Sequence, residues 1–238
     1  MTQITATLID SMGSDLSVVN AARVSFGKES EWEPAGAVDD PYSVIKLKDK
    51  DKRLIQFLAK HKHLSPFGHA FASFHIKAPI FVARQLVKHK FLRWNEISRR
   101  YVDDEPEFYT PDVWRGRSAD KKQGSEGVVA IDYSRDYSPF CEDWDLDDGR
   151  RCSPEQITVE VYKDLLARGV APEQARMILP QSTMTEWYWS GSLDAFAAMC
   201  RLRCAPDTQY ESRLVADPIS DIMAGLFPVS WAALMGEN

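Results

Sequence analysis

The feature that most constrains the fold is a change of hydrophobic period at Pro79. Residues 69–78, HAFASFHIKA, alternate between apolar side chains such as Phe74 and Ile76 and a second, more polar set. A period of two residues is typical of a strand with one buried face. Pro79 then opens the apolar segment 80–90, and proline is favourable at the first position of a helix. The sequence therefore predicts a strand that leads directly into a helix.

The rest of the chain alternates between strand-like and helix-like segments without an internal repeat, which argues against a solenoid. Strands are expected at 3–10 and 183–191, and helices at 15–27, 51–63, 153–169, 171–180, 192–204 and 206–227. The helix at 15–27 has Asp15 available as its cap and Gly27 as its stop. The helix at 153–169 has the clearest limits, because Ser153 and Gln156 form a capping box and Gly169 ends it.

Length and composition set the broad class of the protein. A chain of 238 residues with 44% apolar residues is expected to form one domain, 1–238, with a sizeable core. Its charged, glycine-bearing segment at about 112–152 is expected to be a polar surface insertion without regular elements. The net charge of −6 argues against nucleic-acid or membrane binding, so any positive potential must be local. Without a leader or a long apolar run, we expect a cytoplasmic protein whose four cysteines are reduced.

The sequence KHKFLRWNEISRRY, residues 88–101, concentrates cations in this acidic chain. Counted over 84–100, six lysines and arginines are opposed only by the carboxylate of Glu96. A local cationic pocket suits a small phosphorylated ligand. If the SRRY segment is extended, Ser98 and Arg100 share one face and could bind the same phosphate. A charged surface turn is the alternative interpretation.

Other residues of this run also have a structural alternative. Lys88 and Lys90 follow a predicted helix, and cations near a helix C-terminus are favoured by the helix dipole alone. Asn95 and Glu96 offer the donors and acceptors that the edge of a uracil or a flavin requires. Glu96 could instead balance the neighbouring positive charge.

Motifs for several other chemistries are absent. The histidine cluster HKHLSPFGH at 61–69 has no accompanying HExxH or CxxC motif. The acidic residues at 142–148 lack the pattern of a calcium loop and are expected to be a solvated loop. We therefore expect no metal site. The absence of GxSxG, GxGxxG and GxxxxGKS/T argues against a serine hydrolase and against the common nucleotide-binding loops.

The cationic run resembles the signature of the flavin-dependent thymidylate synthases, RHRxxSxNExSxRY. The spacing is unbroken, and the matching positions are His89, Asn95, Glu96, Ser98, Arg100 and Tyr101. Lys88, Lys90 and Arg93 stand where the signature has Arg, Arg and Ser. The resemblance continues in AARVSF near residue 21, in HLSPFGHAFASFHIKAPIFVARQ before the run, in EFYTP after it, and in ARMILPQ and RLRCAPDTQYE later.

This resemblance implies a fold, an activity and an assembly. The fold is of class α+β, with helices packed on an antiparallel or mixed sheet. The activity is the reductive methylation of dUMP to dTMP, in which methylenetetrahydrofolate donates the carbon unit and FAD, reduced by NADPH, donates the hydride. In that family no enzyme cysteine attacks the pyrimidine, which agrees with the lack of a convincing activated thiol here. The assembly is a homotetramer with active sites shared between subunits.

The resemblance also assigns roles to residues by position. Those implied for dUMP are Gln85, Lys88, Glu96, Ile97, Ser98, Arg99, Arg100, Arg176 and Arg203. Arg203 is the implied catalytic residue, because a cation at the pyrimidine favours its ionised N3 and enriches the electron density at C5. Those implied for FAD are His63, Ser65, Lys88, His89, Lys90, Asn95, Glu96, Ser192, Asp194 and Ala198.

Departures from the family pattern leave specific expectations and alternatives. Lys88 and Lys90 lack the planar fork of arginine, so we expect weaker flavin retention. Ser192, Asp194 and Ala198 stand where the family often has Asn, Arg and Asn, and Asp194 would repel a flavin phosphate. The first alternative is a related pyrimidine-nucleotide methylase or hydroxymethylase with an altered substrate. The second is a nucleotide-binding or nucleic-acid-binding module without catalysis.

Overall fold

A computed structural model describes residues 3–35, 45–119, 125–131 and 153–236 of the chain. Its centre is a four-stranded antiparallel sheet with the strand order β1-β4-β8-β5. The strands are β1 (Thr5–Met12), β4 (Phe71–Pro79), β8 (Met184–Ser192) and β5 (Leu92–Glu96). Helices and an antiparallel sheet together make an α+β fold, as predicted.

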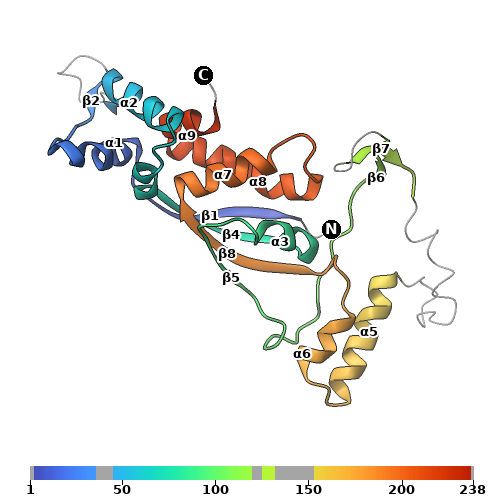
Figure 1. The fold of residues 1–238 in the computed structure, drawn as a ribbon. Helices are drawn as coiled ribbons and strands as arrows, with labels where there is room; N and C mark the ends of the chain where they lie inside the picture. The colour runs from blue at the N-terminus through green and yellow to red at the C-terminus, as the bar shows by residue number, and fades with distance from the viewer. Residues whose placement is uncertain (1–2, 36–44, 120–124, 132–152, 237–238) are drawn as a thin grey trace.

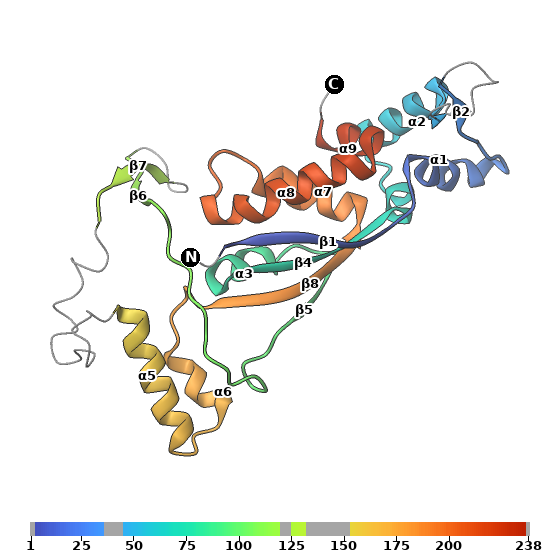
Figure 2. The same cartoon turned by 180° about the vertical axis from the view of Figure 1, so that it is seen from behind.

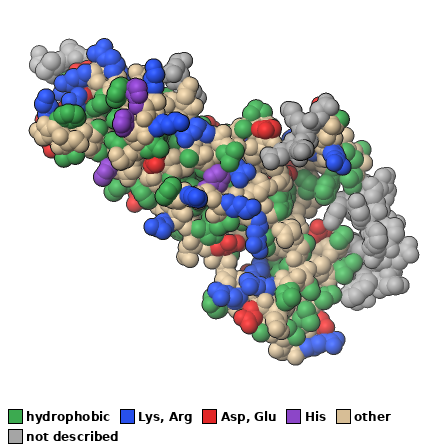
Figure 3. All heavy atoms as spheres, viewed as in Figure 1, with side chains coloured by type: hydrophobic (Ala, Val, Ile, Leu, Met, Phe, Trp, Pro, Cys, Tyr) green, Lys and Arg blue, Asp and Glu red, His purple; other side chains and the backbone are tan. Residues whose placement is uncertain are grey.

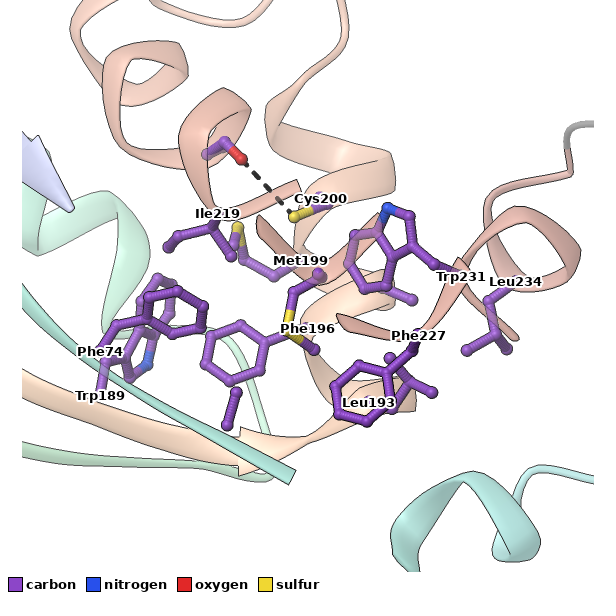
Figure 4. Close-up of a cluster of buried hydrophobic side chains, with 14 of the residues drawn as sticks. Phe74, Trp189, Leu193, Phe196, Met199, Cys200, Ile219, Phe227, Trp231 and Leu234 are labelled. Atoms are coloured by element: carbon purple, nitrogen blue, oxygen red, sulfur yellow. Dashed lines mark hydrogen bonds between the residues drawn. The ribbon is translucent and has the colours of Figure 1, made fainter. Parts of the chain in front are cut away.

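Helices cover one face of this sheet. Figures 1 and 2 show α7 (Leu193–Arg203), α8 (Tyr210–Leu226) and α9 (Pro228–Met235) on the same side of the strands. Figure 4 shows the core between them, where Phe196 of α7 meets the sheet. Its ring lies edge-on to Phe74 and Trp189, with centroids 5.2 and 5.7 Å apart. Edge-to-face pairs of this kind add to the stabilisation that burial provides.

The predicted strand and helix around Pro79 are confirmed. In β4 the side chains of Phe74 and Ile76 are fully buried, while the alternate positions are partly exposed. Pro79 is the N-cap of α3 (Ile80–Leu86), so the chain passes from strand to helix without a loop. The helix ends at Leu86, earlier than predicted, and Phe91 has a φ of 67° in the turn that follows. The first basic residues of the signature therefore lie in a turn between α3 and β5.

Asp15 does not cap the helix that it begins. Helix α1 (Asp15–Arg23) has Ser14 as its N-cap, followed by the short helix η1 (Val24–Phe26) and Gly27 in a left-handed conformation. The carboxylate of Asp15 instead accepts hydrogen bonds from the backbone N–H groups of Val229 and Ser230, at 3.0 and 2.8 Å. These belong to the first turn of α9, where free N–H groups favour an anion. The predicted cap thus stabilises a different helix, at the far end of the chain.

Some of the remaining elements confirm predictions, and others were not predicted. Helix α2 spans Asp49–Lys60, α5 spans Pro154–Ala167 with the predicted capping box, and α6 (Pro172–Ala175) continues into η4 (Arg176–Ile178). The sequence did not predict α9, β2 (Glu33–Pro34), β3 (Ile45–Lys46) or η2 (Ser65–His69). In Figures 1 and 2, α5 and α6 project away from the sheet, opposite α7 and α8.

The segment 112–152 was expected to lack regular elements, and this is wrong for its first part. Strands β6 (Trp114–Arg117) and β7 (Ser125–Val129) pair as a hairpin. The acidic residues at 142–148, together with Cys141 and Cys152, lie outside the described residues. Among the described helices, none has the length and hydropathy needed to cross a bilayer.

Candidate active site

The middle of the signature forms β5, at the edge of the sheet beside β8. A Cβ at Gly191 would collide with the side chain of Leu92, so glycine lets the two strands come close. Glu96 pairs with the buried Trp187, and Asn95 pairs with the exposed Tyr188. Successive side chains of a strand point to opposite faces. Asn95 and Glu96 of one chain are therefore on different faces of the sheet.

Arg203 forms hydrogen bonds with the segment that precedes β5. Its Nε donates to His89 Nε2 at 3.0 Å, and its Nη2 donates to the backbone oxygen of Gln85 at 3.1 Å. The Gln85 side chain is held in turn by Gln209 and by the hydroxyl of Ser212. Two acceptors thus fix the plane of the guanidinium, and its Nη1 group has no hydrogen-bond partner among the described residues.

The electrostatics of this pair favour a neutral imidazole. Burial, and then the charge of Arg203, lower the pKa of His89 to about 4. Burial also lowers the pKa of Arg203. At neutral pH His89 is therefore uncharged, and Nε2 is the nitrogen that accepts the hydrogen bond. This hydrogen bond assigns the ring proton to Nδ1.

A second group of predicted residues lines a cavity of about 180 Å³. Its walls include Glu96, Ile97, Arg99 and Arg176, which come from β5, the segment after it, and η4. Arg99 donates to the backbone oxygen of Asp104 at 2.9 Å. The cavity lining, as far as the chain is described, does not include Gln85, Lys88 or Arg203. One chain therefore does not bring all the residues predicted for dUMP to a single place.

The SRRY segment is a turn, and the extended conformation considered for it is wrong. The backbone N–H of Tyr101 donates to the oxygen of Ser98 at 2.9 Å. Ser98 and Arg100 nevertheless meet, because Arg100 Nε donates to Ser98 Oγ at 3.1 Å. Arg100 also lies over the ring of Tyr101, which is 77% exposed. Figure 3 shows lysine and arginine side chains gathered over β5 and the segment after it.

Several residues predicted for FAD come from segments that meet at the other end of β5, whereas Asn95 and Glu96 are the last two residues of that strand. The backbone N–H of Leu193, at the start of α7, donates to the backbone oxygen of Ala70. Ala70 directly follows η2, the helix that begins at Ser65. The turn at Phe91 lies against Gly191, just before Ser192. These contacts bring the surroundings of Ser65, Lys90 and Ser192 to one region of the molecule. Ala198 lies further along α7, exposed.

Two details bear on whether these residues fit a flavin. Lys88 and Lys90 are exposed, and neither forms an ion pair within the described residues, so both are available to phosphate. The hydroxyl of Ser192 donates to Asp194 Oδ1 at 2.6 Å, which ties these two side chains together at the start of α7. His63 lies beside Phe57, with ring centroids 6.3 Å apart. The cations fit an anionic cofactor, whereas Asp194 opposes it.

Sequence reasoning missed two residues that contact Glu96. Thr185 Oγ1 donates to Glu96 Oε1 at 2.7 Å, and Trp94 Nε1 donates to Glu96 Oε2 at 3.0 Å. Trp94 occupies a position that the signature leaves open, and Thr185 lies on β8, 89 residues away. The strand at 183–191 was predicted, but its register against β5 was not. The described residues contain no cluster of His, Cys, Asp and Glu that could hold a metal ion.

Comparisons with known proteins show the family to which the chain belongs. Residues 7–229 match the family described as "Thymidylate synthase complementing protein". A flavin-dependent thymidylate synthase from Thermus thermophilus is 37% identical over 229 residues, which cover 95% of this chain and 73% of the relative. The chain belongs to the flavin-dependent thymidylate synthase family. Another member of this family, from Kosmotoga olearia, is 38% identical over 96% of this chain and 88% of its own.

A solved structure extends the family comparison. The UMP/dUMP methylase PolB from Streptomyces cacaoi, bound with 5-Br UMP, superposes with a TM-score of 0.76 at 29% identity. The match covers 99% of this chain and 95% of PolB. The resemblance to the flavin-dependent thymidylate synthase family that the signature predicted is thus confirmed, as is the α+β fold.

Proposed function

We propose that this chain is a flavin-dependent thymidylate synthase that converts dUMP to dTMP. Methylenetetrahydrofolate is the carbon donor, and FAD reduced by NADPH is the hydride donor. The observation that carries the proposal is the placement of Arg203, whose guanidinium is held by His89 and Gln85 from the segment that leads into the signature. Membership of the family supports the same reaction.

The roles of the residues follow from their chemistry. Arg203 stabilises negative charge on the pyrimidine at N3, which raises the electron density at C5, the carbon that receives the methyl group. Its fixed orientation means that little reorganisation is needed during the reaction. Ser98 and Arg100 together bind the nucleotide phosphate, for which a hydroxyl and a planar guanidinium are suited. Glu96 accepts a hydrogen bond from the sugar hydroxyl of the nucleotide at the rim of the cavity.

A cysteine nucleophile is not part of this proposal. Cys200 is fully buried, and Cys204 is partly buried beside it. The hydrogen bond with Cys204 and burial raise the pKa of the Cys200 thiol well above its usual value. Because a thiolate is the reactive form, Cys200 is a poor nucleophile. Methylation without an enzyme–pyrimidine thioether agrees with this environment.

The cofactor would be held where the predicted flavin residues meet. Bound FAD would supply the hydride that reduces the transferred carbon unit to a methyl group. Lys88 and Lys90 would neutralise its phosphates, and His89 would orient Arg203 beside it. The Ser192–Asp194 pair offers no cation there, which adds to the reasons to expect modest FAD affinity.

We further propose that the active sites are shared in a homotetramer. Of the residues predicted for dUMP, one group surrounds Arg203 and another lines the cavity beside Glu96. Two chains that join these groups would complete a nucleotide site. The exposed Tyr101 and Phe91, 77% and 84% exposed, offer apolar surface for such contacts.

UMP is a second candidate substrate, because the structurally similar PolB is described as a UMP/dUMP methylase. A further alternative is methylation or hydroxymethylation of another pyrimidine nucleotide. The discriminating variable is the substrate that yields product, since the fold and the cofactor would be the same. Supplying dUMP, UMP and dCMP separately therefore separates these alternatives.

The test is a reconstituted reaction with purified protein. FAD, NADPH and methylenetetrahydrofolate are added with each nucleotide, and products are identified by mass. We expect dTMP from dUMP, and a yellow protein after FAD is added and excess is removed. A colourless protein that makes no methylated nucleotide and binds oligonucleotides with steep salt dependence would instead favour a binding module.

A further inference from the structure

The carboxylate of Glu96 is held at both of its oxygens. Thr185 Oγ1 donates to Oε1 at 2.7 Å, and Trp94 Nε1 donates to Oε2 at 3.0 Å. Both donors come from the sheet itself, one from β8 and one from β5. Glutamate has several rotatable bonds, and fixing it costs conformational entropy. Here that cost is met by the folded sheet before any ligand binds.

The two donors are themselves fixed by the core. The ring of Trp94 stacks on Trp187 with centroids 4.3 Å apart and an interplanar angle of 19°. Trp187 is 1% exposed, so the indole of Trp94 stacks on a buried side chain of the core. Thr185 is 5% exposed and β-branched, which restricts its side-chain torsion. The positions of both donors are therefore set by packing rather than by solvent.

The backbone after Glu96 is fixed as well. The N–H of Ile97 donates to the oxygen of Glu186 at 2.9 Å, which continues the pairing of β5 with β8 beyond the strand. Hydrogen bonds thus fix both the backbone beside Glu96 and its carboxylate. Glu96 and Thr185 both line the cavity of about 180 Å³, so the fixed carboxylate borders space that a ligand can enter.

The arrangement leaves capacity for a ligand. An ionised carboxylate offers about four acceptor positions, of which Trp94 and Thr185 use two. A hydroxyl group of the nucleotide sugar that enters the cavity can therefore bind Glu96 without displacing either donor. A hydrogen bond to a charged, pre-oriented acceptor is strong, because little freedom is lost when it forms.

We propose that Trp94 and Thr185 are positioning residues that orient Glu96 for the pyrimidine nucleotide. The inference rests on the proposed function, since it assigns the nucleotide as the ligand of Glu96. Trp94 lies at an open position of the signature and Thr185 lies outside it, so neither is assigned by the family pattern. Their part in the reaction is indirect and acts through the Glu96 carboxylate.

The experiment compares Thr185→Val with Thr185→Ser in the FAD-loaded enzyme. Valine keeps the shape and loses the donor, whereas serine keeps the donor. We expect Thr185→Val to raise the Kd and the KM for dUMP about tenfold, with a smaller change in kcat, and Thr185→Ser to restore both. Trp94→Phe, which keeps an aromatic ring and removes the N–H, should shift the same constants in the same direction.

Matched controls separate positioning from stability. Thr183 is also buried on the same chain segment, and its hydroxyl donates to the backbone oxygen of Pro180 at 2.7 Å. Thr183→Val should lower Tm as much as Thr185→Val and leave the Kd for dUMP unchanged. Trp231 donates to Ser220 at 3.2 Å in the helical layer, so Trp231→Phe is the corresponding control for Trp94.

Each outcome decides the inference. An unchanged Kd and KM in Thr185→Val, with an active wild type, would overturn it while leaving the proposed function intact. Failure of Thr185→Ser to restore binding would overturn it too, because packing would then explain the loss. A wild-type protein that neither binds nor methylates a pyrimidine nucleotide would refute the proposed function itself, and this inference with it.

Discussion

The two ends of the signature differ in how firmly one chain holds them. Before β5, Arg203 is tied to His89 and Gln85, partly buried, with the pKa values of both ionisable partners lowered. After β5, Arg100 is exposed, and among the described residues its hydrogen bonds and its ring contact are with its neighbours Ser98 and Tyr101. A single chain thus fixes the guanidinium proposed for chemistry and leaves the one proposed for phosphate free to adapt.

This difference matches the different demands on the two groups. Stabilising developing charge requires a donor that is already in place, because reorganisation raises the barrier. Binding a phosphate tolerates adjustment, because each nucleotide can draw the side chain into position when it binds. The comparison therefore predicts that loss of Arg203 lowers turnover, whereas loss of Arg100 weakens nucleotide binding.

The largest effect is expected for Arg203→Ala. Loss of a pre-oriented cation at the pyrimidine should lower kcat about 100-fold to 1,000-fold, as removal of one charge-stabilising donor does in other enzymes. The measurement is steady-state formation of dTMP with saturating FAD, NADPH and methylenetetrahydrofolate.

Arg201→Ala is the control for this variant. Arg201 lies on the same helix and donates to the backbone oxygen of Leu234, so its loss should lower Tm and leave kcat unchanged. If Arg203→Ala raised KM and kept kcat, Arg203 would act in binding. The proposed difference between Arg203 and Arg100 would then be wrong.

The next effect is expected for Arg100→Ala. Loss of a charge-assisted hydrogen bond to phosphate should raise the KM for dUMP about tenfold to 100-fold, with a small change in kcat. Arg168→Ala is the control, because Arg168 is exposed and pairs with Asp164 on α5. A fall in kcat at unchanged KM would place Arg100 in the chemistry, contrary to the comparison.

The sequence predicts the parts of the fold that depend on local patterns. The alternation in 69–78 located β4, and the capping box at Ser153 located α5, because both signals lie within a few residues. The destination of Asp15 could not be predicted, since it caps a helix more than 200 residues away. Tertiary contact, rather than propensity, decides which helix receives that carboxylate.

The candidate site divides in the same way. The signature predicted Glu96 and Arg100 as site residues by their spacing, but it could not show that the SRRY segment forms a turn. Neither could it show that Thr185 binds Glu96, because that contact depends on the register between β5 and β8. Residues that support a site are found from the pairing of strands, which one sequence does not display.

An intermediate effect concerns pH and His89. Its pKa is about 4 in the folded protein and 6.5 unperturbed, so the unfolded state binds more protons between these values. The free energy of unfolding therefore rises with pH from about 4 to 6.5. Above that range the titration of His89 contributes no further change. His89→Gln keeps an acceptor for Arg203 but does not titrate.

Thermal unfolding at several pH values tests this prediction. The Tm difference between the wild type and His89→Gln should shift in favour of the variant as the pH falls from 6.5 towards 4. The charged group facing the imidazole is Arg203, and the ring of Trp189 lies 6.5 Å away, so protonation has no compensating anion among these partners. A pH-independent difference would show that His89 titrates normally and is not held neutral.

The smallest effect is expected from Lys88→Arg and Lys90→Arg, which restore the arginines of the signature. Arginine can bind phosphate through two parallel hydrogen bonds, so the Kd for FAD should fall about threefold to tenfold in the double variant. Flavin fluorescence titration measures this, and Lys163→Arg, at an exposed ion pair on α5, is the matched control. An unchanged Kd would mean that these lysines do not limit flavin retention, and the Ser192–Asp194 pair would then be the region to change, starting with Asp194→Asn. Because both lysines lie in the turn before β5, a gain in FAD affinity without a change in the KM for dUMP would also sharpen the separation between the two ends of the strand.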